Sequence, residues 1–204
     1  MIVVVDYGMG NLRSVSKALE RVGAAVRVSD QARDVAEADK LIVPGVGAFD
    51  MAMEELRRRH LVEPITQAVA SGVPYLGICL GLQMLFEFSE EGQAAGLGVL
   101  PGRVKRFTVA PPLKVPHMGW NRVRRPTGAA GDCPLLAGVP DDSFFYFVHS
   151  YYADPSDRSA MALETDYGRP FTSMIWRERL FATQFHPEKS QEEGLKLLEN
   201  FVRV

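Results

Sequence analysis

Short apolar runs alternate with helical patterns through the first half of the chain, and this alternation narrows the choice of fold most. The expected strands are Ile2–Val5, Ala25–Val28, Lys40–Val43 and Val73–Gly77, and the expected helices are Leu12–Val22, Phe49–Arg59 and Leu80–Phe88. Apolar runs of this length between amphipathic helices are typical of βαβ units, in which helices cover both faces of a mostly parallel sheet. We therefore predict an α/β fold built as a three-layer sandwich.

The second half of the chain changes character, because strand patterns follow one another there without helices between them. These strands are expected at Gly98–Arg106, Asn121–Arg125, Phe144–Val148, Met161–Glu164, Ser173–Trp176 and Phe181–Gln184, before a closing helix at Gln191–Val202. Successive strands joined by turns favour antiparallel pairing. We expect an antiparallel extension of the sheet, and a single domain that spans residues 1–204.

Composition and charge exclude several classes of function. The formal net charge is −2 and the 23 basic residues are scattered, so no nucleic-acid partner is indicated. The opening apolar run is broken by Asp6 and has no basic segment before it, which argues against a signal peptide or a membrane span. Cys79 and Cys133 lie far apart, which predicts neither a disulfide framework nor a metal site. We expect a cytoplasmic protein without a cofactor.

The stretch "GICLGLQ" holds Cys79 between Gly77 and Gly81, where a strand pattern gives way to a helical pattern. A turn of the form Gly-x-nucleophile-x-Gly exposes its central side chain at the top of a sheet, and small neighbours make room for it. The amino end of the following helix favours the thiolate form of a cysteine. Two interpretations stay open from this motif alone: a nucleophile, or a small buried residue flanked by glycines for packing.

A candidate base lies in "ATQFHPEKS", where a strand pattern leads into His186, Pro187 and Glu188. Residues two apart in extended chain point the same way, so Glu188 can accept from one imidazole nitrogen while the other faces a thiol. Taken alone, each residue is equally compatible with a structural role. His186 would then be a core residue, and Glu188 an acidic residue at the start of a helix. Together with Cys79 they predict a nucleophilic triad.

The glycines of "IVPGVGAFD" follow a buried strand and form the third candidate element. Gly45 and Gly47, on either side of Val46, let the backbone approach a ligand closely or turn a peptide N–H toward it. Such a loop can complete an oxyanion hole, together with the amide of Leu80 next to the candidate nucleophile. The alternative is a plain turn between a strand and a helix.

These three motifs, in this order and spacing, resemble the oxyanion strand, the nucleophile elbow and the His-x-Glu block of the class I glutamine amidotransferases. The resemblance covers nearly the whole chain. It implies that Cys79 attacks the side-chain amide of glutamine, that His186 is the base and that Glu188 orients it. It also implies substrate contacts, which are expected from Gly45, Val46, Gly47, Leu80, Gln83, Ser150 and Tyr151.

Two further motifs, "DYGMGNLRSV" and "VPHMGWN", resemble those members of the family that supply ammonia to a separate, barrel-shaped cyclase subunit of histidine biosynthesis. The resemblance implies a heterodimer with that subunit. The residues expected to face it are Asn11, His117, Met118, Trp120, Asn121 and Lys189. Trp120 read by itself is equally compatible with a place in the core.

Three alternatives remain for the function. One is the glutaminase of another class I amidotransferase complex, and a second is a stand-alone γ-glutamyl cysteine hydrolase, which needs the same elbow, base and oxyanion hole. The third is a regulatory module without enzymatic activity, in which Cys79 senses oxidants.

Overall fold

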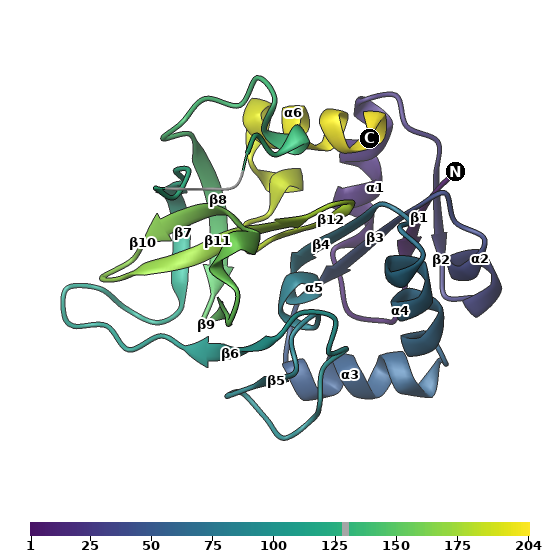
Figure 1. Ribbon diagram of the computed structural model, residues 1–204, viewed down its shortest axis with the longest axis horizontal. Helices are drawn as coiled ribbons and strands as arrows, with labels where there is room; N and C mark the ends of the chain where they lie inside the picture. Colours follow the sequence, from purple (N-terminus) through teal and green to yellow (C-terminus); the bar gives the residue numbers. More distant parts are fainter. Residues whose placement is uncertain (128–130) are drawn as a thin grey trace.

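The computed structural model describes residues 1–127 and 131–204 (Figure 1). Within these residues the main sheet has ten strands, and a separate sheet has two. The strands of the main sheet, in spatial order, are β2 (Val26–Ser29), β1 (Ile2–Val5), β3 (Lys40–Gly45), β4 (Tyr75–Cys79), β12 (Leu180–Thr183), β11 (Pro170–Arg177), β9 (Tyr151–Pro155), β6 (Gly102–Arg106) and β5 (Phe88–Ser89), with β10 (Met161–Asp166) paired to β11. The separate sheet pairs β7 (His117–Arg122) with β8 (Phe144–His149).

The direction of the strands divides the main sheet into two parts. From β2 through β1, β3 and β4 to β12, every neighbouring pair is parallel. From β12 onward the pairs β12–β11, β11–β9 and β9–β6 are antiparallel. The predicted parallel sheet with an antiparallel extension is thus confirmed.

Helices cover both faces of the parallel part of the sheet, which gives the predicted three layers (Figure 1). One face carries α1 (Leu12–Arg21) and α6 (Gln191–Arg203), which also contact each other. The other face carries α2 (Ala32–Ala36), α3 (Phe49–Arg58) and α4 (Val62–Ala70). Within the described part of the chain, every helix falls short of the length and apolarity that a bilayer crossing needs.

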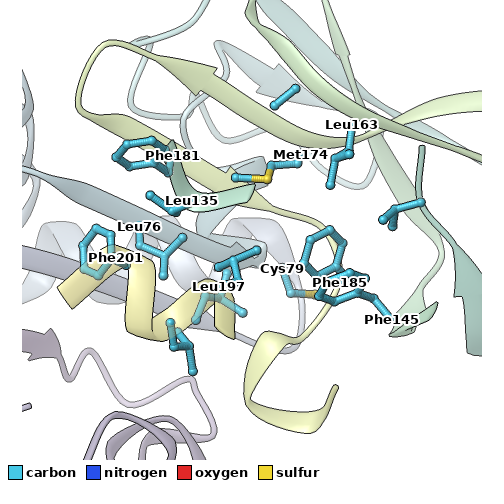
Figure 2. Close-up of a cluster of buried hydrophobic side chains, with 14 of the residues drawn as sticks. Leu76, Cys79, Leu135, Phe145, Leu163, Met174, Phe181, Phe185, Leu197 and Phe201 are labelled. Carbon is cyan, nitrogen blue, oxygen red and sulfur yellow. The ribbon is translucent and has the colours of Figure 1, made fainter. Parts of the chain in front are cut away.

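The core consists of two clusters of buried apolar side chains, one on each face of the sheet. In β1, Ile2 and Val4 point into the cluster beneath α1 and α6, whereas Val3 and Val5 point into the other. Both faces of this strand are therefore buried, which explains why its sequence is apolar throughout rather than alternating. Figure 2 shows the first cluster, where Leu197 and Phe201 of α6 lie near Leu76 of β4.

The helix expected at Leu80–Phe88 is shorter in the structure, where α5 spans Leu80–Gln83. The carbonyl of Met84 accepts from the amide of Leu97 and that of Leu85 accepts from Leu100, at 2.8 and 2.9 Å. Because these carbonyls bond to a distant segment instead of to the next helical turn, the helix stops and the chain enters β5. Helices α2 and α4 and strand β9 were not expected from the sequence.

A leucine-to-alanine substitution tests whether α1 is held by its buried face. Leu19 is fully buried in the first cluster, whereas Lys17 of the same helix is exposed. We expect Leu19→Ala to lower the free energy of unfolding by about 2–5 kcal/mol, because it removes buried methyl groups and leaves a cavity. Lys17→Ala, the matched control, should change it by less than about 0.5 kcal/mol. Equal effects of the two substitutions in denaturant unfolding would contradict this packing.

Candidate active site

The carboxyl ends of three neighbouring parallel strands bring the candidate residues together. Gly45 ends β3, Cys79 ends β4, and the two lie opposite each other in the parallel register. Strand β12 lies on the other side of β4 and ends at Thr183, three residues before His186. Ligand sites of parallel sheets lie at this edge, because the loops that follow the strands meet there.

Cys79 has a left-handed backbone conformation, with φ 56° and ψ −105°, and forms the turn between β4 and α5. This turn requires small neighbours. A Cβ on Gly77 would lie 2.6 Å from the carbonyl oxygen of Gly81, and a Cβ on Gly81 would lie 1.8 Å from that of Val43. The spacing of the two glycines therefore reflects the close approach of α5 to the sheet, and the turn has the geometry of a nucleophile elbow.

His186 and Glu188 form a buried pair immediately beyond β12. Nδ1 of His186 donates to Oε1 of Glu188 over 2.8 Å, and both side chains are at most 2% exposed. The loop is fixed by Ser190, whose hydroxyl donates to the carbonyl of His186 and accepts from the amide of Tyr146. Nε2 of His186 has no hydrogen-bond partner among the described residues, so this nitrogen is free to exchange a proton.

Electrostatics couple His186 to Cys79. Burial lowers the pKa of the imidazole, but the charge and the contact of the Cys79 sulfur and then the hydrogen bond and charge of Glu188 outweigh burial and raise the pKa to about 10. When the sulfur is ionised, the ring is therefore protonated at neutral pH. A thiolate beside an imidazolium held by a carboxylate is the arrangement that a cysteine nucleophile needs.

A cavity of about 380 Å³ opens above the sulfur. It is lined by Val46, Gly47, Cys79, Leu80, Gln83, Glu91, Pro116, Val148, His149, Ser150 and Tyr151. The residues expected to contact substrate thus all lie at this cavity except Gly45, which is buried beneath it. Glu91, Pro116, Val148 and His149 were not expected there, because separate loops and strand β8 bring them in.

The amide of Gln83 is already engaged by the protein. Its Nε2 donates to the carbonyl of Tyr151 over 3.0 Å and to Oε1 of Gln184 over 3.1 Å. Both N–H groups are thereby used, and what this side chain can offer a ligand is its carbonyl oxygen, an acceptor. Gln184 was not singled out in the sequence, although it directly follows β12 and lies two residues before His186.

The loop after β3 combines a buried and an exposed part. A Cβ on Gly45 would lie 2.2 Å from the hydroxyl of Tyr7 and 2.8 Å from Cβ of Leu80, so only glycine fits. Val46 is 40% exposed, and Gly47 has φ +98°, a conformation that L side chains rarely adopt. Glycine is therefore needed at these two positions for different reasons. Close packing leaves no room for a side chain at Gly45, whereas the backbone conformation favours glycine at Gly47.

The residues expected to face a partner fall into three groups, which are exposed, buried and half-buried. Met118 and Trp120 are exposed on β7, and Lys189 is exposed in the loop after His186, with Nζ 5.7 Å from the ring centre of Tyr146. His117, by contrast, is only 3% exposed, and hydrogen bonds hold it inside the protein. Its side chain therefore has little surface to offer a partner.

The remaining two interface candidates are half-buried. Asn11 precedes α1, which packs against the segment Pro187–Lys189. Asn121 of β7 bonds to the ring of His117 and to the carbonyl of Asp166.

Substituting Gly81 tests the close approach that forms the elbow. We expect Gly81→Ala to lower the free energy of unfolding by at least about 2 kcal/mol, because the new methyl group collides with the backbone of Val43. The control is Gly10→Ala, where the nearest atom to a Cβ is 3.4 Å away and the effect should stay within about 1 kcal/mol. Denaturant unfolding measures both, and a Gly81→Ala protein as stable as the control would disprove the geometry.

Comparison with known proteins places the chain in a family. Residues 3–204 match the family model described as "Glutamine amidotransferase class-I". A protein of Synechococcus elongatus named "Imidazole glycerol phosphate synthase subunit HisH" is 54% identical over 202 residues, covering 98% of this chain and 92% of the relative. A protein of Syntrophotalea carbinolica with the same name is 53% identical over 209 residues, covering 98% of both chains.

Solved structures show the same fold at much lower sequence identity. A structure titled "Crystal structure of glutamine amidotransferase" superposes with a TM-score of 0.76 at 18% identity and covers all of both chains. The PurLQS structure from Thermotoga maritima gives a TM-score of 0.74 at 19% identity, with 99% of this chain and 97% of that chain covered. By sequence and by fold, the chain belongs to the class-I glutamine amidotransferase family, in the branch that its HisH relatives form.

Proposed function

We propose that this chain is the glutaminase subunit of an imidazole glycerol phosphate synthase. It hydrolyses glutamine to glutamate and ammonia and passes the ammonia to a cyclase subunit in histidine biosynthesis. The observation that carries this proposal is that the Cys79 elbow and the His186–Glu188 pair lie at the ends of the neighbouring strands β4 and β12, in a chain whose relatives at 51–54% identity are named HisH subunits.

In the first half of the reaction, the thiolate of Cys79 attacks the side-chain carbonyl carbon of glutamine. A bond forms between sulfur and carbon, and the carbonyl electron pair moves to oxygen. The imidazolium of His186 then gives its Nε2 proton to the leaving nitrogen, so that ammonia departs and a glutamyl thioester remains. Glu188 keeps the ring in place and stabilises its positive charge.

In the second half, water attacks the thioester. The neutral His186 accepts a proton from the water, the carbon–sulfur bond breaks, and glutamate leaves while the thiolate and imidazolium are restored. Both tetrahedral intermediates carry a negative oxygen. Backbone N–H groups of the Gly45–Gly47 loop and of Leu80 are the donors that we propose for it, since these segments flank Cys79.

The cavity suits an amino acid with a terminal carboxamide. Gln83 contributes an acceptor, because both of its N–H groups are bonded to the protein, and we propose that it receives an N–H from glutamine. Ser150 and Tyr151 also line the cavity, and we propose that they complete the substrate contacts. The volume of about 380 Å³ lies at the small end of ligand sites, as a single amino acid requires.

The partner is proposed to be a cyclase subunit of barrel fold, bound as a heterodimer. The exposed apolar side chains Met118, Trp120 and Phe144 lie on the paired strands β7 and β8 and fit a protein interface. Lys189 lies beside Tyr146 of β8, and its segment Pro187–Lys189 contacts α1, the helix that Asn11 precedes. We propose that Lys189 and Asn11 belong to the same partner surface. The cyclase would use the ammonia to form imidazole glycerol phosphate and aminoimidazole carboxamide ribotide.

A stand-alone γ-glutamyl hydrolase would use the same three catalytic residues. Rates with glutamine and with γ-glutamyl peptides, each measured with and without a cyclase subunit, separate the two functions. The proposed subunit prefers glutamine and is stimulated by the cyclase, whereas a stand-alone hydrolase would act on peptides and ignore it.

Replacing the nucleophile tests the chemistry. We expect Cys79→Ala to lower glutamine hydrolysis in the presence of the cyclase by at least about 1,000-fold, because no other group can form the thioester. Complex formation should be unchanged, since the interface lies on β7 and β8. Glutamate release and analytical ultracentrifugation measure the two properties.

The matched control is Cys133→Ala. Cys133 is also buried, but burial raises the pKa of its thiol to about 12, so that it stays protonated and inert. This variant should keep activity within about threefold of the unsubstituted protein. Retention of glutaminase activity by Cys79→Ala, or its loss in Cys133→Ala, would count against the proposed nucleophile.

A further inference from the structure

A buried glutamine outside the expected triad contacts the sulfur. Gln184 is fully buried, and its Nε2 lies 3.6 Å from Sγ of Cys79, with geometry that makes it a donor. Its Oε1 accepts from Nε2 of Gln83 over 3.1 Å, and its backbone N–H donates to the carbonyl of Ser173. The carboxamide is thus held at both ends and turns its N–H group toward the nucleophile.

The direction of these hydrogen bonds is fixed by one backbone carbonyl. The oxygen of Tyr151 can only accept, so the group of Gln83 that faces it must be the NH₂. That NH₂ also faces Gln184, which must therefore present its oxygen to Gln83 and its nitrogen to the sulfur of Cys79. A reversed amide at either glutamine would set two acceptors or two donors against each other.

The carbonyl of Tyr151 also accepts a hydrogen bond from His149, which is itself hydrogen-bonded to His117. Nδ1 of His149 donates to the oxygen of Tyr151 over 2.7 Å, and Nε2 of His149 lies 2.9 Å from Nδ1 of His117. Nε2 of His117 in turn lies 3.2 Å from Nδ2 of Asn121 on strand β7. Hydrogen bonds therefore connect β7 continuously to the nucleophile.

Burial keeps both histidines neutral. It lowers the pKa of His149 to about 3 and that of His117 to about 4, so neither ring is charged at neutral pH. With its proton on Nδ1, His149 accepts at Nε2 from His117, which accepts in turn from the amide of Asn121. Each ring has one tautomer that satisfies its contacts, and the network has one arrangement.

We propose that Gln184 is a catalytic residue, because it donates a hydrogen bond to the thiolate of Cys79. This inference rests on the proposed function and adds to it a donor that holds the sulfur in line for attack. The members of the network that act through Gln184 are positioning residues, namely Gln83, His149, His117 and Asn121. A hydrogen bond to a charged acceptor is worth more than a neutral one, and the dry surroundings strengthen it further.

The test removes the donor while keeping the length of the side chain. Gln184→Met should slow alkylation of Cys79 by iodoacetamide at pH 7 about 10- to 100-fold and reduce kcat for glutamine with the cyclase to a similar degree. KM should change by less than about threefold, because Gln184 does not line the cavity and Gln83, which does, keeps its hydrogen bond to the carbonyl of Tyr151. Peptide mass spectrometry identifies the alkylated cysteine.

Thr183→Val is the matched control. Thr183 is a buried neighbour in β12 whose hydroxyl donates to the carbonyl of Phe185, away from the sulfur. It should leave both rates within about threefold of the unsubstituted protein. A folded Gln184→Met protein that reacts at the unsubstituted rate would overturn the proposal.

If Gln184→Met fails to fold, a second variant tests the hydrogen-bond network that positions Gln184. His117→Phe keeps the stacking of the ring on Tyr167 and Phe147 but removes its hydrogen bonds, and should slow alkylation about 3- to 10-fold. An unchanged rate in His117→Phe would then overturn the positioning role. Alkylation requires no substrate, so these comparisons remain decisive even if the chain proves inactive on glutamine and the proposed function fails.

Discussion

The close approach of α5 to strand β3 is the constraint on which the site depends. Without side chains at Gly77 and Gly81, the helix comes so near the sheet that Cys79 must turn its backbone into the left-handed region. Such a conformation costs about 1–3 kcal/mol at a residue other than glycine, and the buried clusters on both faces of the sheet hold it in place. The position of the sulfur is therefore set by packing, before any catalytic partner is considered.

Two further segments of the site, the loop after β3 and the segment after β12, are placed by strands that pair with the strand of Cys79. Gly45 lies opposite Cys79 in the register of β3 and β4, which places the exposed Val46 and Gly47 at the cavity. Strand β12 pairs with β4 on the other side, so that the chain delivers His186 to the same edge. Three segments that are distant in the sequence thus converge because parallel strands end together.

Local patterns in the sequence were enough to predict this framework. The strands that carry Gly45 and Cys79 are short apolar runs bounded by glycine. The pairing of His186 with Glu188 was expected from an extended segment. In the structure the two residues do pair, but across a 3-10 turn, because Pro187–Lys189 form a short 3-10 helix directly after His186. These features depend on neighbouring residues only, so they can be recognised without knowing which elements pack together.

The parts that could not be predicted depend on tertiary pairing. Helix α5 ends at Gln83 because carbonyls beyond it bond to residues 97–100, a contact that no local pattern reveals. The link from His117 through His149 to Gln184 exists only once β7, β8, β9 and β12 are assembled. His117 was expected at a partner surface because the motif "VPHMGWN" was assigned to that surface as a whole, whereas in the structure Met118 and Trp120 are exposed and His117 is buried.

The ion pair between the Cys79 thiolate and the His186 imidazolium is the centre of the proposed chemistry, and ¹⁵N NMR of the imidazole tests it directly. The pKa of His186, raised to about 10 first by the sulfur and then by Glu188, predicts a ring that is protonated at pH 8 and loses its proton near pH 10. In Cys79→Ala the largest of these raising effects is absent, and the ring should titrate at lower pH. A neutral ring at pH 8 in the unsubstituted protein, or the same titration in both proteins, would contradict the ion pair.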